Sequence, residues 1–498
     1  MQQEIETLQK HLKKLHAFEH FSGVMYYDME TVMPSGAAED FAADMGVLGE
    51  ELYKMQTDPA FKELVKTLAA RKDELDRNTR RQVELLEEDI ASIDCIPMEE
   101  YVAYQMEQST ATTVWQKAKI SNDYAAFMPH LAKLIDYNRR FALYYKPDQL
   151  PYDTLLNQFE KGMTVEILDA FFADIRQKLQ PLVKAAAERE KDIDDSFLFG
   201  HFPVEQQRRL SDYIMSVMGI DRAYCAIGEV EHPFTTNFSK HDVRITTHYY
   251  EDALASSFYS VVHEGGHALY ELHTGDEMQG TLLASGTSMG IHESQSRFFE
   301  NIIGRGKAFT ALVFPKLQEL FPDALANRTA EEFYRAVNKS VPSLIRTEAD
   351  ELTYPFHIMI RYEIEKQLFA GTLSAQDAPK EWNRLYKEFL GVEVPDDTHG
   401  ILQDSHWSGG MFGYFPSYAL GSAYGAQFLA AMEKELDVSA AVEKGDLTAI
   451  VGWLSEKIYQ YGRVKTPAQL IADVCGAPFD PEYYVAYLYK KYSALYNL

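Results

Sequence analysis

The distribution of apolar residues along the chain is typical of amphipathic helices. In the first twenty residues, Ile5, Leu8, Leu12 and Leu15 recur at steps of three and four, with Lys and Glu between them. We predict that this helix packs on its own fold, with a dimer helix or a lid as the alternative. The same period recurs in residues 61–93, 165–191, 330–341, 381–389 and 481–498.

One segment predicts a strand. Residues 242–249 (DVRITTHY) alternate and are rich in β-branched side chains, and they end just before a helical run that begins near Asp252. The chain has only 28 Gly and 19 Pro, fewer than the usual share of about 12%. No repeat or Gly/Ser linker divides it. We therefore predict a mainly α fold with a small β element, built as a single domain over residues 1–498.

The charge of the chain excludes several classes of partner. With 75 acidic and 48 basic residues, the formal net charge is −27, which argues against nucleic acid and against anionic membrane surfaces. No apolar run is long enough to cross a membrane, and the N-terminal residues do not form a secretory signal. Three widely spaced cysteines indicate a reducing compartment, so we expect a cytoplasmic protein.

Histidines cluster in the middle of the chain. Seven of the 15 fall between His232 and His292, and two of them form the motif His263-Glu264-Gly265-Gly266-His267. On a helix, residues four apart share a face, so both imidazoles can bind one metal ion while Glu264 acts on a water as general base. The adjacent glycines cost helix stability, which predicts a close backbone or ligand approach there.

Three residues are candidates for a third ligand. Glu271 lies eight residues after His263, about 12 Å along the same helix and too far to share the ion. His273 has the offset of a third histidine in HExxHxxGxxH, but Tyr270 stands where that motif needs Gly, so we expect the helix to continue and carry His273 away. Glu293 follows a Gly/Ser/Thr-rich turn that allows a second helix to pack on the first. We favour Glu293.

Two imidazoles, one carboxylate and a water are typical of catalytic zinc, and such a site attacks a carbonyl, most often a peptide bond. The oxyanion that forms needs a donor such as Tyr, His or Arg. An exopeptidase also needs an Arg for the free carboxylate, and Arg244, Arg297 and Arg346 are candidates. The spacing alone indicates a metallopeptidase, but it does not indicate whether the enzyme cleaves at an end of the peptide or within it.

Several separated motifs carry a family resemblance. They are, in chain order, DxxTxMPxG at 28–36, HPF at 232–234, DxRxT at 242–246, HEGGH at 263–267, HESQSR at 292–297, IRxxAD at 345–350, GxxQDxHW at 400–407 and GYFPSY at 413–418. With these motifs the chain resembles the thermostable zinc carboxypeptidases of the carboxypeptidase Taq type over nearly its whole length.

The resemblance implies a large helical body with a deep active-site groove, similar to neurolysin and angiotensin-converting enzyme, in one body or in two lobes flanking the groove. It implies a homodimer that releases single C-terminal amino acids with broad specificity, poorly at Pro. It implies Zn²⁺ on His263, His267 and Glu293, with Co²⁺ or Mn²⁺ as substitutes, and Glu264 as the general base.

The same resemblance makes Arg244 a candidate for the substrate terminus, with Arg346 as a second, and HPF places His232 at the end of the groove. We assign Tyr418 to the oxyanion, with a packing role as the alternative, and expect His406 to line the site. From the acidic charge we expect slow release of C-terminal Asp and Glu. The rival interpretations are an oligopeptidase that cuts short peptides internally and a non-catalytic acidic helical scaffold.

Overall fold

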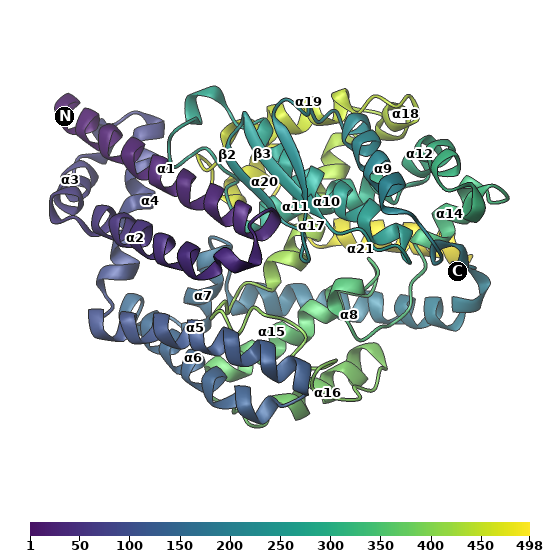
Figure 1. The fold of residues 1–498 in the computed structure, drawn as a ribbon, viewed down its shortest axis with the longest axis horizontal. Helices are drawn as coiled ribbons and strands as arrows, with labels where there is room; N and C mark the ends of the chain where they lie inside the picture. The colour runs from purple at the N-terminus through teal and green to yellow at the C-terminus, as the bar shows by residue number, and fades with distance from the viewer.

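The N-terminal helices form a group with a small core of their own (Figure 1). In the computed structural model, which describes residues 1–498, these are α1 (Gln2–Thr31), α2 (Ala38–Thr57), α3 (Pro59–Ala69) and α4 (Arg77–Asp94). Leu8, Leu12 and Leu15 of α1 are buried against α3 and α4. The first helix therefore packs on its own fold, as predicted.

The stretch predicted as one helical run over residues 61–93 is two helices. The first ends at Ala69 and a short 3₁₀ turn at Lys72–Glu74 follows it. The Asp76 side chain then accepts hydrogen bonds from the backbone N–H groups of Asn78 and Thr79, and the second helix begins. Such an N-cap competes with continuation of the preceding helix, which periodicity alone does not reveal.

The remaining helices form the main body. The first group is α5 (Met98–Ser121), α6 (Tyr124–Tyr145), α7 (Pro151–Phe159), α8 (Val165–Glu188), α9 (Val204–Val217), α10 (Leu254–Leu272) and α11 (Met289–Arg297). The second is α12 (Lys307–Leu320), α13 (Pro322–Leu325), α14 (Ala330–Val337), α15 (Tyr354–Ala370), α16 (Ala378–Leu390), α17 (Pro416–Met432), α18 (Val438–Glu443), α19 (Thr448–Lys457), α20 (Pro467–Cys475) and α21 (Glu482–Tyr496). The mainly α fold is confirmed, although α14 ends four residues before the predicted limit.

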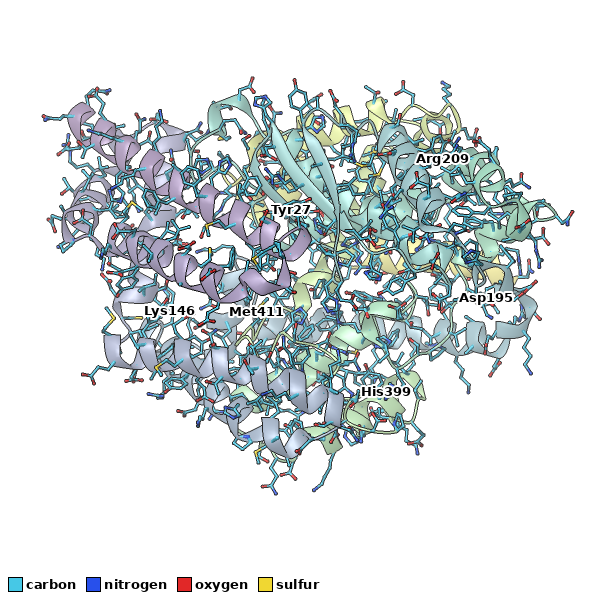
Figure 2. All side chains as sticks on the ribbon, in the orientation of Figure 1. Tyr27, Lys146, Asp195, Arg209, His399 and Met411 are labelled. Carbon is cyan, nitrogen blue, oxygen red and sulfur yellow. The ribbon has the colours of Figure 1, made fainter.

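The sheet has three strands in the order β1-β3-β2. The predicted strand is confirmed as β3 (Asp242–Thr247), which pairs parallel with β1 (Cys225–Glu229) and antiparallel with β2 (Thr235–Ser239). The C-terminal half of α1 lies beside this sheet, where Figure 2 labels Tyr27. The His20 ring stacks on Phe238 of β2 with centroids 4.8 Å apart, so α1 and the sheet are in direct contact.

One large apolar core joins the sheet to the helical body. Helices α10, α11 and α17 lie deep within it, and most of their residues are buried. No helix is long and apolar enough to span a membrane. The three cysteines form no disulfide.

Candidate metal centre

Helix α10 presents His263 and His267 on one face, with ring centroids 5.0 Å apart. Glu293 comes from α11, and its Oε2 lies 3.7 Å from His263 Nε2 and 3.5 Å from His267 Nε2. One ligand atom from each residue falls within 4.8 Å of the other two. Two imidazoles and one carboxylate at these separations suit a single cation bound at about 2.0–2.2 Å from each.

The second glycine of the motif, Gly266, sets how closely α10 and α11 approach. A Cβ on Gly266 would lie 2.6 Å from the carbonyl oxygen of Gln295 and 2.8 Å from Ser296 Cα, so the backbones of α10 and α11 are in contact there. The predicted close approach is thus confirmed. On the other side of α11, a Cβ on Gly421 of α17 would lie 2.7 Å from the Glu293 Cβ. Glu293 is therefore held between two helices that approach through glycine.

A buried carboxylate holds the beginning of α11. Glu160, just after α7, accepts a hydrogen bond from the Gly290 N–H at 2.9 Å and one from the Tyr424 hydroxyl at 3.2 Å. Burial raises the pKa of Glu160 to about 7, although both donors and Ser288 favour the ionised form. The helix that carries Glu293 is therefore fixed at its N-terminus by a group from a distant part of the chain.

A second carboxylate supports His263. Residues Phe298–Gly304 continue α11 as a π-helical turn, and Glu300 Oε2 in this turn lies 2.9 Å from His263 Nδ1. Arg297 donates from Nε to Glu293 Oε1 at 2.7 Å and from Nη1 to Glu300 at 3.2 Å. The His263 Nε2 is thereby left facing Glu293.

Charges within this cluster decide the protonation states. Burial alone would raise the pKa of both Glu293 and Glu300, but the charges of Arg297 and His263 have the larger effect. They lower the pKa of Glu300 to about 2 and hold that of Glu293 well below its usual range. Burial lowers the pKa of His267 to about 3. Burial also opposes the charge on His263, but Glu293 and Glu300 raise its pKa overall. These shifts favour ionised carboxylates and a neutral His267, as cation ligands require.

Glu264 is buried beside the histidines and is oriented from the sheet. The Thr235 hydroxyl of β2 donates a hydrogen bond to Glu264 Oε2 at 2.5 Å. Burial raises the pKa of Glu264, while His263 and Thr235 act in the opposite direction. A carboxylate with a raised pKa and a fixed orientation suits general-base chemistry near neutral pH.

The two sequence motifs near the sheet form one unit. Phe234 of HPF donates its N–H to Thr246 Oγ1 at 2.7 Å, and the Thr246 hydroxyl donates back to the Phe234 carbonyl at 2.9 Å. His232, the first residue of HPF, is exposed. Because Thr235 directly follows Phe234, this unit also carries the residue that orients Glu264.

Arg244 and Arg346 differ in their surroundings. Arg244 pairs with Asp242 through Nε and Nη2, both at 2.9 Å, and lies between the rings of Tyr27 and Phe238. The side-chain hydrogen bonds of Arg244 use Nε and Nη2 but not Nη1, and its side chain is 23% exposed. The structure thus leaves one edge of this guanidinium open.

Arg346 is buried, and all three of its nitrogens are engaged. Nε and Nη2 donate to Asp404 Oδ1 at 2.9 and 2.8 Å, and Nη1 donates to the Tyr354 hydroxyl at 3.1 Å. Its guanidinium lies 5.0 Å from the centre of the Tyr418 ring. The His406 Nε2 is 3.1 Å from the Tyr418 hydroxyl. Arg346, His406 and Tyr418 are thus in one packed group.

The two alternative third ligands lie outside the cluster. Helix α10 continues past Tyr270 to Leu272, as predicted, and the Nδ1 of His273 is 2.8 Å from the Leu269 carbonyl. Glu271 instead contacts His292. Sequence reasoning gave no role to Thr235, Glu300 or His292. Glu300 lies seven residues after Glu293, which is the spacing of one helical face and the signal that could have revealed it.

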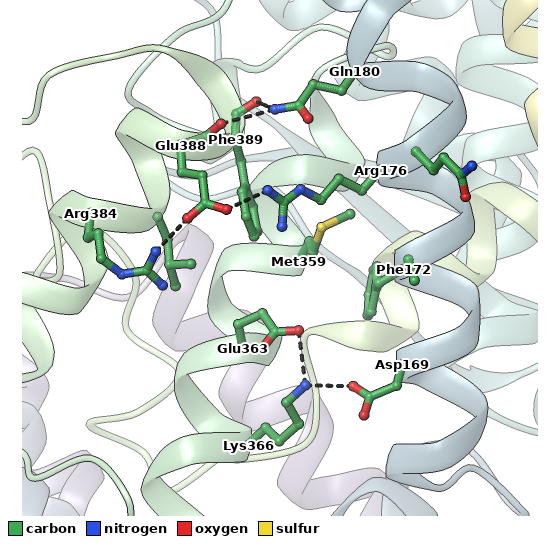
Figure 3. A pocket seen from close by; sticks show the side chains of 13 residues that line it. Asp169, Phe172, Arg176, Gln180, Met359, Glu363, Lys366, Arg384, Glu388 and Phe389 are labelled. Carbon is green, nitrogen blue, oxygen red and sulfur yellow. Dashed lines mark hydrogen bonds and ion pairs between the residues drawn. The ribbon is translucent and has the colours of Figure 1, made fainter.

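Two pockets of the structure are lined by residues outside this cluster. A pocket of about 580 Å³ lies between α8, α15 and α16 (Figure 3). Its charges are paired with one another: Lys366 Nζ is 2.6 Å from Asp169 and 3.0 Å from Glu363, and Glu388 pairs with Arg176 and Arg384. A cavity of about 360 Å³ between α1 and β2 lies nearer the site, because the Asn237 that lines it is on the same strand as Thr235.

Comparisons with known proteins agree with this geometry. The family described as carboxypeptidase Taq (M32) metallopeptidase matches residues 7–492. The chain belongs to this family. It is 41% identical to carboxypeptidase 1 of Bacillus subtilis over 99% of this chain and 100% of that protein. It is 34% identical to thermostable carboxypeptidase 1 of Pyrococcus furiosus, with 98% of each covered.

Solved structures of M32 carboxypeptidases have the same fold. That of the Deinococcus radiodurans R1 enzyme superposes with a TM-score of 0.96 at 35% identity, covering 100% of both chains. Metallocarboxypeptidase 1 of Trypanosoma cruzi gives a TM-score of 0.94 at 34% identity, covering 99% of this chain and 100% of that one. The protein is therefore a metallocarboxypeptidase that acts on peptides, and a metal cofactor follows from its family.

Proposed function

We propose that this M32 carboxypeptidase releases single C-terminal amino acids from peptides, using Zn²⁺ held by His263, His267 and Glu293, with Co²⁺ or Mn²⁺ as substitutes. The observation that supports this most is that one ligand atom each from His263, His267 and Glu293 lies within 4.8 Å of the other two. The lowered pKa of Glu293 favours its ionised form, which a cation needs. When bound there, the cation would supply a Lewis acid for the scissile carbonyl and would lower the pKa of water.

Glu264 is the proposed general base. Its buried carboxylate would take a proton from the attacking water and pass it to the leaving amine. The hydrogen bond from Thr235 supports this role because it leaves the carboxylate little freedom to rotate.

Tyr418 is the proposed oxyanion donor, and His406 is proposed to orient it. Burial lowers the pKa of His406 to about 4, so the ring is neutral near pH 7. Its Nδ1 is buried without a hydrogen-bond partner. A proton on Nε2 would donate to the Tyr418 oxygen and would leave the phenolic proton free for the oxyanion of the substrate.

Arg244 is the proposed partner of the substrate carboxylate, because its Nη1 edge is open. Arg346 fits this role less well, since Asp404 and Tyr354 occupy its nitrogens. We propose that Arg346 contributes by packing against Tyr418, and that the exposed His232 lies at the end of a substrate groove.

The acidic surface supports slow release of C-terminal Asp and Glu. Poor cleavage at Pro is proposed from the family resemblance.

A peptide ladder with free and amidated C-termini, followed by mass spectrometry with and without a chelator, tests the proposal. We expect stepwise loss of single residues from the free peptides only, abolished by the chelator. Dipeptides or larger fragments released from amidated peptides would indicate an oligopeptidase. No cleavage by the metal-loaded protein would indicate a non-catalytic scaffold.

The remaining proposals concern the state of the protein in the cell. We propose a homodimer, on the family resemblance, and a cytoplasmic location, which the three cysteines without a disulfide support. We also propose that residues 1–498 form one peptidase domain. Sedimentation equilibrium would test the dimer, and a single cooperative unfolding transition would support one domain.

A further inference from the structure

The two histidines of the motif are supported differently. His263 Nδ1 contacts the carboxylate of Glu300 directly. His267 has no carboxylate at its Nδ1. Instead its Nδ1 lies 2.6 Å from the Nδ1 of His292, and the Nε2 of His292 lies 2.7 Å from Glu271 Oε1. A second imidazole therefore stands between a metal-facing histidine and its carboxylate.

The contacts fix where the protons are. His267 Nε2 faces Glu293, and a ligand nitrogen must carry no proton, so the proton of the neutral ring is on Nδ1. This Nδ1–H then donates to His292 Nδ1. His292 must carry its own proton on Nε2, which donates to Glu271. Each contact in the series has one donor and one acceptor.

Glu271 is anchored at the far end of this series. Its side chain is 1% exposed, and Oε2 accepts a hydrogen bond from Asn237 Nδ2 of β2 at 2.8 Å. Oε1 also accepts from the Ser285 hydroxyl and the Gly286 N–H, both at 3.2 Å. The carboxylate is thus fixed from the sheet and from the loop that precedes α11.

The His292 ring has little room to turn. A Cβ on Gly286 would lie 2.6 Å from His292 Cδ2, so the loop packs directly on the ring. On another side the Tyr270 ring lies 5.2 Å away, centre to centre. The orientation of His292 is therefore set by packing as well as by hydrogen bonds.

We propose that His292 and Glu271 are positioning residues that fix the tautomer and orientation of His267 for cation binding. This inference rests on the proposed metal site. It gives β2 a double role, because Thr235 orients Glu264 and Asn237 anchors the series that ends at His267. Partners of this kind change metal affinity by about 10- to 100-fold when they are removed.

The test measures Zn²⁺ affinity by competition with a chromophoric chelator. We expect His292→Leu to weaken Zn²⁺ binding about 10- to 100-fold. His292→Asn should recover most of this loss, because the Asn Oδ1 can stand where His292 Nδ1 accepts. Glu271→Gln keeps the shape, so we expect a smaller loss of about 3- to 10-fold and a changed visible spectrum of the Co²⁺ form. His273→Ala, on the same helix but outside the series, is the control.

Two further measurements separate the possible failures. If His267→Ala binds Zn²⁺ as tightly as the wild type, the proposed metal site is wrong. If His267→Ala loses Zn²⁺ while His292→Leu and Glu271→Gln stay within twofold of the wild type, the positioning role is wrong. Thermal unfolding of the metal-free variants shows whether the fold is intact. Equal losses in His292→Leu and His292→Asn would also contradict the proposal.

Discussion

The hydroxyl of Thr235 donates a hydrogen bond to the carboxylate of Glu264 across the junction between β2 and α10. This contact joins the three-stranded sheet to the helix of the HEGGH motif. It sets both the orientation of the carboxylate and its proton affinity, because a hydrogen bond to the ionised form lowers the pKa.

Thr235→Val removes this hydrogen bond at nearly constant volume. We expect kcat to fall about 10-fold, less than the 10²- to 10⁴-fold loss expected when a general base is removed, because Glu264 itself remains, and we expect bound metal to be unchanged. The pKa of Glu264 should rise further, since Thr235 is one of the groups that lower it. The base is active when deprotonated, so the acid limb of kcat/KM should move to higher pH. An unshifted limb would show that Thr235 does not act on the base.

Glu264→Gln removes the base but leaves the three proposed ligands intact. We expect the metal content to remain near one per chain and kcat to fall by about 10²- to 10⁴-fold, as for loss of a general base. Metal analysis of the same sample that is assayed keeps the two effects apart. Turnover near that of the wild type would refute the proposed mechanism.

Glu293→Gln tests the third ligand. We expect it to lose bound metal, because the neutral amide is a much weaker ligand for a cation than the carboxylate and no longer balances the charge of Arg297. His273→Ala should keep the metal, since His273 Nδ1 lies 2.8 Å from the Leu269 carbonyl and its ring lies beside Tyr459, outside the metal cluster. Atomic absorption after dialysis measures both. If Glu293→Gln kept the metal and His273→Ala lost it, the third ligand would be His273 and not Glu293.

Arg244→Ala should weaken recognition of the substrate terminus. We expect kcat/KM to fall about 10- to 100-fold, the value of one charge-assisted hydrogen bond, with little change in thermal stability. The specific measurement compares binding of an inhibitor with a free carboxylate and of its amide, because the variant should lose the preference between them.

Arg346→Ala should instead lower the unfolding temperature, since Asp404 loses a buried partner. If Arg244→Ala still preferred the free carboxylate over the amide, and a folded Arg346 variant did not, then Arg346 and not Arg244 would bind the substrate terminus.

Glu160 should make stability depend on pH. Burial raises its pKa to about 7 in the folded state, against 4.5 for an ordinary Glu. The folded state then holds a proton that the unfolded state has released, so stability should fall as pH rises from about 4.5 to about 7, by up to about 3 kcal/mol.

Glu160→Gln removes this titration. Its amide oxygen can accept from Gly290 while its NH₂ donates to the Tyr424 hydroxyl, so the variant should match the wild type at pH 5 and exceed it at pH 8. Urea unfolding of the metal-free proteins checks this, with the exposed Glu166→Gln as control. Parallel stability curves for wild type and Glu160→Gln would contradict the assignment.

The sequence predicts β3 and several helices, among them α1, α8 and α10, because their signals are local, but it predicts neither β1 nor β2. The Gly265-Gly266 pair indicates a close approach, yet the neighbours of these glycines, the backbone at Gln295 and Ser296 for Gly266 and the Met218 side chain for Gly265, are evident only in the folded chain. Thr235 and His292 had no local signal, since each acts on a residue 25 or more positions away. Motif spacing thus identified the candidate ligands, whereas tertiary contacts determine how each one is held.

The HEGGH residues are held from three directions: His263 by the turn after α11, Glu264 by β2, and His267 through His292. A designer who transplants these five residues onto an unrelated helix would therefore obtain a metal-binding peptide without an oriented base. The smallest portable unit for engineering spans β2 through Glu300, about 66 residues that include the sheet edge, both helices and the loop between them.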